Sequence, residues 1–165
     1  MVGGGVRPGK REDRVLTNGF NHVAVVTADT ERFVRFYAEV FEAEELGHED
    51  LGPAGRLTFV KVGEQAEFNV FELEGNTEWE RQTPMLGRGR LDHLALQAAS
   101  LPDFEEARRR LMERGAADDF VTDFGPVLSM FFRDPDGLEC EVCVENPDAR
   151  PGVFNPPGTR AARYS

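Results

Sequence analysis

Two short stretches decide the fold: FNHVAV at residues 20–25 and LDHLAL at residues 91–96. Their histidines, His22 and His93, are 71 residues apart. The same spacing places Phe33 over Phe104 and Phe41 over Met112 in the segments that follow. Self-similarity that continues from one segment into the next at a fixed spacing predicts two copies of one structural module.

Each module begins with a strand and continues with a helix. In FNHVAV, His22 and Ala24 face one way and Val23 the other, which is the alternation of a half-buried strand. The first helix begins at Asp29 or Thr30, either of which can cap it. Its apolar residues recur at helical spacing and predict a stripe that faces the core. The stripe consists of Phe33, Tyr37, Val40 and Phe41.

The second helix has clearer start and stop signals. Ser100 is the expected N-cap, with Asp103 three residues later in the place of a capping-box acid. Pro102 is tolerated in the first turn, and Gly115 is the expected end. The apolar stripe consists of Phe104, Ala107, Leu111 and Met112.

Strand-like runs follow each helix, at 57–62 and 67–73 in the first module and at 127–132 and 138–144 in the second. The turn residues Asp134 to Gly137 join the last two. We therefore expect one α+β domain that spans residues 1–165. Its parts are an N-terminal extension (1–18), a first module (19–75), a linker (76–90), a second module (91–146) and a C-terminal tail (147–165).

Composition excludes several classes of function. With a net charge of −11, the chain has little from which to build a basic face, so we expect no nucleic-acid partner. No apolar run approaches the roughly 20 residues that span a bilayer, and no secretory signal opens the chain, so a cytoplasmic protein without a membrane partner is expected. Cys140 and Cys143 face opposite sides of a strand and are expected to act as small hydrophobic residues. The acidic cluster of Glu42, Glu44 and Glu45 is expected on a solvated helix surface.

Three residues are candidates for a metal site. His22 and His93 hold equivalent places in the two modules, so a pseudo-twofold axis would bring both imidazoles together from the same face. Glu141 shares a strand face with Glu139 and Cys143, within an apolar run where burial of a carboxylate is costly unless it is paired or binds a metal.

The paired modules, the early histidines and Asp-Pro-Asp-Gly followed by Leu-Glu-Cys-Glu (134–141) resemble the vicinal oxygen chelate superfamily. This superfamily includes glyoxalase I, bleomycin-resistance proteins, fosfomycin-resistance enzymes, methylmalonyl-CoA epimerase and extradiol ring-cleaving dioxygenases. The resemblance covers roughly residues 19–146 and implies two paired βαβββ modules whose curled mixed sheet encloses a metal cup. By motif, it places His22, His93 and Glu141 on the metal-ligand positions, and it implies a homodimer.

The fourth ligand position separates the reactions that the resemblance implies. The best alignment places Asn69 there, which leaves two histidines and one carboxylate, as in non-haem Fe(II) oxygenases. A two-residue slip would supply Glu67 instead and favour proton transfer of the glyoxalase or epimerase type. A metal-free drug-binding protein is the third alternative. His48 and Glu67 are the only weak candidates for catalytic residues.

The favoured prediction is therefore an extradiol-type dioxygenase that acts on a small molecule. Its cofactor would be a divalent metal ion, with Fe2+ or Mn2+ favoured over Zn2+, Ni2+ or Co2+.

Overall fold

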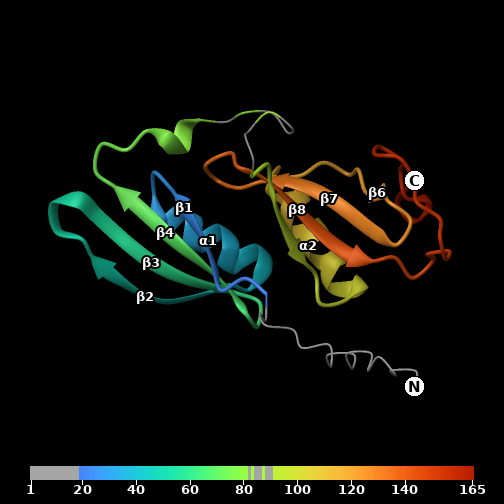
Figure 1. The fold of residues 1–165 in the computed structure, drawn as a ribbon, viewed down its shortest axis with the longest axis horizontal. Coiled ribbons are helices and arrows are strands. Elements are labelled where there is room, and N and C mark those ends of the chain that lie inside the picture. Colours follow the sequence, from blue (N-terminus) through green and yellow to red (C-terminus); the bar gives the residue numbers. More distant parts are fainter. Residues whose placement is uncertain (1–18, 82, 84–86, 88–90) are drawn as a thin grey trace, which may run out of the picture.

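The computed structural model describes residues 19–81, 83, 87 and 91–165; the N-terminal extension and part of the linker lie outside them. It contains two four-stranded sheets, each with one helix (Figure 1). The first module contains β1 (His22–Val26), α1 (Thr30–Phe41), β2 (Glu44–Asp50), β3 (Gly55–Val62) and β4 (Ala66–Leu73). The second contains β5 (Leu94–Gln97), α2 (Leu101–Glu113), β6 (Thr122–Asp123), β7 (Val127–Arg133) and β8 (Glu139–Glu145). The short 3-10 helices η1 (Gly52–Ala54), η2 (Glu78–Glu80) and η3 (Ala162–Tyr164) lie in the connections and the tail.

Both sheets have the same topology. The strand orders are β1-β4-β3-β2 and β5-β8-β7-β6, with β1 parallel to β4 and β5 parallel to β8. The predicted α+β class and the βαβββ repeat are therefore confirmed. The two sheets share no strand pairing among the described residues, so one chain forms two separate mixed sheets and not a closed barrel. The strands β1 and β5 are edges, because the helix of each module carries the chain across to the opposite edge, β2 or β6.

Both helices begin where the sequence predicts, and α2 ends at Glu113, two residues before the predicted stop at Gly115. The Asp29 side chain accepts a hydrogen bond from the Arg32 amide at 2.9 Å, and the Ser100 side chain accepts one from the Asp103 amide at 3.2 Å. Glu42 ends α1 in the left-handed region at φ 57°, a conformation more usual for glycine. No described helix has both the length and the apolar character that crossing a membrane requires.

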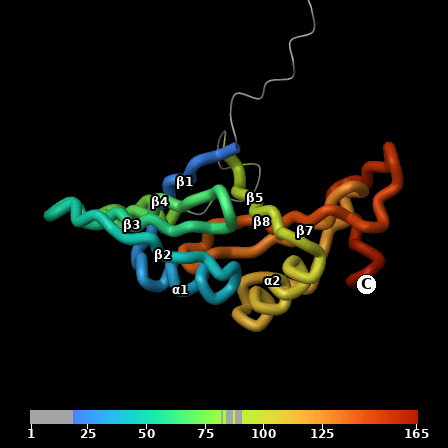
Figure 2. Tube along the Cα trace, turned by 90° about the horizontal axis from the view of Figure 1, so that it is seen from below, coloured from blue at the N-terminus to red at the C-terminus, as the bar shows by residue number. Residues whose placement is uncertain are grey.

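Both helices lie on the same side of the two sheets (Figure 2). The face of each sheet away from its helix is called its open face below. Beneath α1, Phe33 and Tyr37 pack on Phe68, and beneath α2, Phe104 and Leu111 lie in a second core. All five are at most 1% exposed. Since burial of one large apolar side chain contributes about 1.5–3 kcal/mol, these stripes hold each helix on its sheet.

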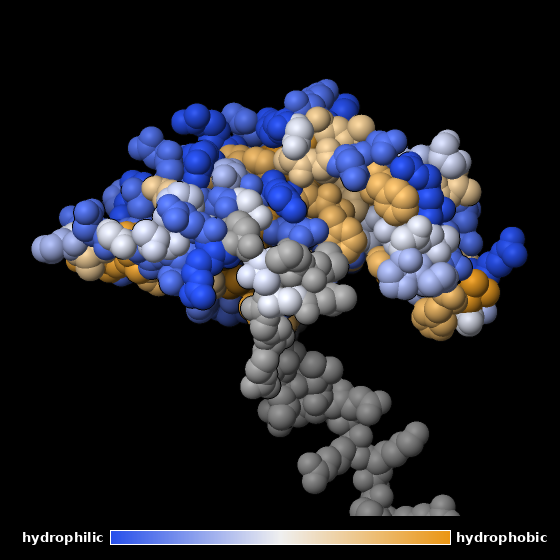
Figure 3. All heavy atoms as spheres, turned by 90° about the horizontal axis from the view of Figure 1, so that it is seen from above, coloured by the Kyte–Doolittle hydropathy of each residue, from blue (hydrophilic) through white to orange (hydrophobic). Residues whose placement is uncertain are grey.

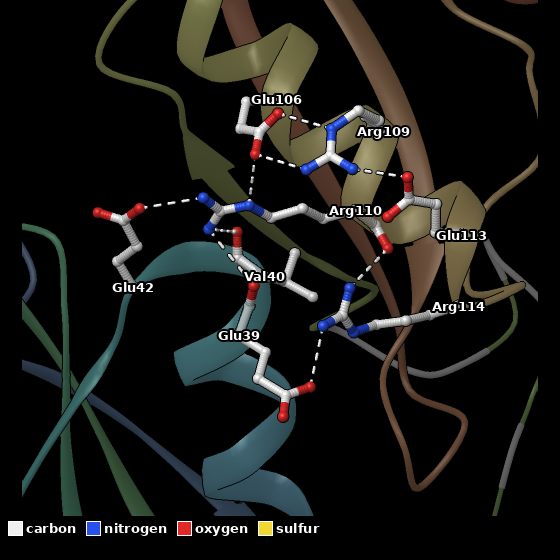
Figure 4. A network of polar contacts seen from close by, with 8 residues as sticks. All are labelled: Glu39, Val40, Glu42, Glu106, Arg109, Arg110, Glu113 and Arg114. Atoms are coloured by element: carbon white, nitrogen blue, oxygen red, sulfur yellow. Dashed lines mark hydrogen bonds and ion pairs between the residues drawn. The ribbon is translucent and has the colours of Figure 1, made fainter.

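Polar contacts join the modules. The Asp136 carboxylate, in the turn between β7 and β8, contacts the Thr27 hydroxyl and the Arg32 guanidinium, each at 2.5 Å. At the other end of α1, Arg110 donates to the Glu39 and Val40 carbonyls, both at 3.3 Å (Figure 4). These carbonyls belong to the last turn of α1, where helical partners are missing.

Two strands differ from the sequence prediction. Glu44 and Glu45 are exposed as expected, but they lie on β2 and not on a helix, and His48 lies on the same strand. This edge strand is exposed on both faces and so lacks apolar alternation. Only its pairing with β3 makes it a strand. The two-residue strand β6 is likewise formed by pairing with β7.

Candidate metal centre

The register of the second sheet places the candidate residues on one face. Ala95 pairs with Glu141, and His93 precedes β5 by one residue. Since paired residues on neighbouring strands share a face, His93, Ala95 and Glu141 all lie on the open face. Cys140, on the other face, is fully buried under α2, which confirms the predicted alternation of β8.

The first sheet repeats this register with different residues. His22 pairs with Glu67, and Ala24 pairs with Asn69. Ala24 and Ala95 hold equivalent places, each two residues after a module's histidine. Asn69 is therefore the counterpart of Glu141, and Glu67 lies two pairs closer to the start of β1, opposite His22.

Asn69 has an unusual environment. Its Oδ1 atom is buried and has no hydrogen-bond partner among the described residues. A buried amide oxygen without a partner costs about 1–3 kcal/mol, so this atom is available to a donor or a ligand on the open face of the first sheet.

His93 and Glu141 are in direct contact. Nε2 of His93 lies 3.1 Å from Oε2 of Glu141, and Nδ1 lies 2.9 Å from Oδ2 of Asp92. The hydrogen bond to Asp92 raises the pKa of His93, Glu141 raises it further, and partial burial opposes both. Of the proposed ligand pairs, this is the one that the structure brings together within one chain.

Glu141 is 8% exposed although its side chain lies on the open face. Its second oxygen, Oε1, accepts a hydrogen bond from the hydroxyl of Ser129 on β7. Burial, followed by the charge of Glu141, raises the pKa of the Cys143 thiol to about 12, so Cys143 is not a reactive thiolate. The sequence prediction missed Ser129, because pairing with Cys143 is what places it on this face.

Asp92 was also missed as a functional residue, although a signal was present. Each histidine follows an Asx residue, and in both modules that side chain contacts Nδ1, at 2.8 Å from Asn21 to His22 and at 2.9 Å from Asp92 to His93. A histidine that donates through Nδ1 presents Nε2 with a free lone pair, as metal ligands usually do.

His22 does not join the other two within one chain. Its side chain is exposed, and its described contact is with Asn21. Among the described residues, no three His, Cys, Asp or Glu side chains lie close enough to hold one metal ion. The three-residue site therefore remains a prediction, with two of its members in place and the third on the other sheet.

His48 lies away from His22 and from the pair of His93 and Glu141. It pairs with Thr58, which faces α1, so His48 is on the opposite face of the first sheet from His22. Its described ion-pair contact is with Glu45, at 3.9 Å. Glu67, the other weak catalytic candidate, shares the open face with His22.

Two hollows lie near the joint between the modules. A cavity of about 590 Å³ is lined by Val23, Phe41, Leu94 and Leu96, but neither His93 nor Glu141 lines it. The space-filling view shows a second hollow in the outline on the side away from the helices, beneath the second sheet (Figure 3). His93 faces this side, with Phe131 edge-on to its ring at 5.9 Å. The open face fits a metal site better, because His93 and Glu141 face it.

The model of the glyoxalase/bleomycin resistance protein/dioxygenase superfamily matches residues 19–142. The chain belongs to this superfamily. The match covers both modules up to the strand that contains Glu141, which confirms the resemblance inferred from the two histidine segments. Among curated proteins, no match to this superfamily member is found.

Solved structures support the superfamily fold. A glyoxalase/bleomycin resistance protein/dioxygenase domain from Frankia sp. EAN1pec has a TM-score of 0.65 and 23% identity, over 80% of this chain and 95% of that one. The fosfomycin resistance protein FosX from Listeria monocytogenes has a TM-score of 0.59 and 16% identity, over 80% of this chain and 97% of that one. A lactoylglutathione lyase from Agrobacterium tumefaciens has a TM-score of 0.55 and 19% identity, over 79% of this chain and 96% of that one. At these identities the similarity shows the fold alone.

Proposed function

We propose that the protein is a metal-dependent superfamily enzyme that acts on a small molecule through two histidines and one carboxylate. The observation that carries this proposal is the register of the first sheet. It places Asn69, and not an acidic residue, at the position that Glu141 holds in the second sheet. A site built from His22, His93 and Glu141 then has one carboxylate, the donor set of non-haem Fe(II) oxygenases.

The residues in place fit a divalent ion in part. Nε2 of His93 and Oε2 of Glu141 face one another, and both kinds of atom bind divalent transition metals. Asp92 orients His93 through the other ring nitrogen. A third donor is needed, and within one chain it is missing from the described residues.

The third donor would come from a second copy of the chain. In each copy β1 and β5 are sheet edges, and the apolar side chains beside them, Phe20 and Leu91, are 85% and 81% exposed. Large exposed apolar side chains beside an edge strand are typical of an interface. In the proposed homodimer, His22 of one copy meets His93 and Glu141 of the other, and twofold symmetry produces two such sites.

We favour an extradiol-type dioxygenase with Fe2+ or Mn2+. When bound, an ion with two imidazole donors and one carboxylate supplies open positions for a vicinal diol and for dioxygen. The chain supplies the rest of the site. The alanines Ala24 and Ala95 leave room in front of the ligands, and Phe131 gives an apolar wall beside His93.

A glyoxalase-type proton transfer is the second candidate, because Glu67 lies directly across from His22 on the same face. A carboxylate there could accept a proton from a carbon next to a carbonyl. A metal-free binding protein is the third candidate function. It does not explain why Asp92 orients His93.

Anaerobic loading of the purified full chain with Fe2+, followed by a panel of catechols in air, tests the favoured function. Ring cleavage produces a yellow product, and we expect it with Fe2+ and not with Zn2+. Turnover of a hemithioacetal with Ni2+, Co2+ or Zn2+ would favour the second candidate. Unchanged ligand affinity after His93→Ala, with no metal bound, would favour the third.

A further inference from the structure

The Ser129 hydroxyl is the polar group on β7 that touches Glu141. Ser129 is 0% exposed, and its Oγ donates a hydrogen bond to Oε1 of Glu141. A serine buried in the sheet, paired with Thr122 on one side and Cys143 on the other, loses its contacts with water, so its partner must replace them. Glu141 is that partner.

The two oxygens of Glu141 are thereby distinguished. Oε1 is held by Ser129, whereas Oε2 faces Nε2 of His93 at 3.1 Å. A free carboxylate can offer a metal ion both oxygens or only one. A hydroxyl that donates to one oxygen draws its electron density away from the metal and fixes the plane of the carboxylate.

We propose that Ser129 is a positioning residue that makes Glu141 a one-oxygen ligand, with Oε2 directed at the metal and Oε1 held back. The inference rests on the proposed function, because it presumes that Glu141 binds a metal. One-oxygen binding by Glu141 matters for the proposed reaction, because it changes the number of positions on the metal that substrate can occupy. Each two-oxygen carboxylate occupies two coordination positions, so one-oxygen binding keeps an additional position for substrate.

The same contact lowers the cost of metal binding. A glutamate side chain has three rotatable bonds, and fixing them costs free energy when the ligand arrives. In this protein β7 fixes them in advance, because Ser129 is in a central part of its strand and is fully buried. Removal of the hydroxyl therefore affects both the affinity and the geometry of metal binding.

The test uses cobalt binding to the full chain with Ser129→Ala, and with Ser129→Thr as the conservative variant that keeps the hydroxyl. Thr58→Val is the matched control, because Thr58 is also a buried hydroxyl residue on a central strand but faces α1. Calorimetry gives the dissociation constant. The visible absorption of bound Co2+ gives the coordination number, since the bands weaken as ligands are added.

For Ser129→Ala we expect metal affinity to fall roughly 10- to 100-fold, the usual effect of losing a partner of a metal ligand. We also expect weaker absorption bands, as Glu141 becomes a two-oxygen ligand. Ser129→Thr should restore both values, and Thr58→Val should change neither. An unchanged affinity and spectrum in Ser129→Ala would overturn the role of Ser129 alone. Cobalt affinity that survives His93→Ala would overturn the proposed metal site itself, and with it this inference.

Discussion

The carboxylate of Asp92 lies 2.9 Å from Nδ1 of His93. The neighbouring module repeats the contact, with an amide from Asn21 in place of the carboxylate. A charged partner makes the imidazole a better electron donor than a neutral partner does. As the proposed metal ligands, the two histidines would therefore differ in strength, although they hold equivalent places.

Replacement of Asp92 tests this difference. In Asp92→Asn, His93 acquires the kind of partner that His22 has, and we expect metal affinity to fall by roughly tenfold because the second ring nitrogen loses its charged acceptor. Titration calorimetry with Zn2+ measures the change. Glu74→Ala is the control, since it removes an exposed carboxylate beyond the end of β4. If the Asp92→Asn protein binds Zn2+ as tightly as the unaltered protein, Asp92 does not tune His93.

Mixing two inactive variants tests whether the site is shared between copies. His22→Ala and His93→Ala should each lose metal binding. In a mixed dimer, His22 of one copy and His93 with Glu141 of the other would form one complete site. Random exchange would then restore about a quarter of the sites of the unaltered protein.

The readouts are metal content after mild unfolding and refolding of the mixture, and mass by light scattering. A mixture of the double variant His22→Ala/His93→Ala with His93→Ala is the control, because no pairing of these chains contains both histidines. The shared site would be contradicted if the first mixture regains no bound metal and the protein has the mass of a monomer.

Glu67 distinguishes the two candidate reactions. It lies beside His22 but is not the counterpart of Glu141. If oxygen chemistry is correct, Glu67→Gln should change kcat for catechol cleavage less than tenfold. If Glu67 accepts a proton, its loss should lower kcat by roughly 100- to 10,000-fold. Steady-state kinetics with each substrate class decide between them, with Glu64→Gln in the exposed turn before β4 as the control.

Asp134 gives the fold a predictable pH dependence. Burial raises the pKa of this carboxyl from 3.8 to about 6, although the amides of Leu138 and Asp136 donate to it and oppose the rise. Between these values the folded chain binds more protons than the unfolded chain, so this residue's contribution to the free energy of unfolding falls as pH rises. The total change is about 3 kcal/mol.

Urea unfolding at pH 4.5 and pH 7 measures this contribution when the unaltered protein is compared with Asp134→Asn. The amide resembles the protonated acid and does not titrate. We expect Asp134→Asn to gain stability relative to the unaltered protein as pH rises. A constant difference between the two proteins over this range would show that Asp134 does not titrate there.

The sequence determined the features that depend on local spacing. Apolar residues at helical intervals and the caps Asp29 and Ser100 are sufficient for α1 and α2, and alternation is sufficient for β1, β4, β7 and β8. The repeat of FNHVAV and LDHLAL predicted both modules, because segments with the same apolar pattern form the same elements. Strand β2 was not predicted, because it lacks apolar alternation and is a strand only through its pairing with β3.

Tertiary structure alone decided which side chains meet. Strand register made Asn69, and not Glu67, the counterpart of Glu141, a choice that a two-residue shift in sequence alignment leaves open. Pairing of β7 with β8 brought Ser129 to Glu141 across 12 residues of chain. His22 and His93 are equivalent by sequence, yet they lie on separate sheets. The physical reason is that sequence spacing fixes the face on which a side chain lies, whereas packing of sheets and copies fixes the distance between faces.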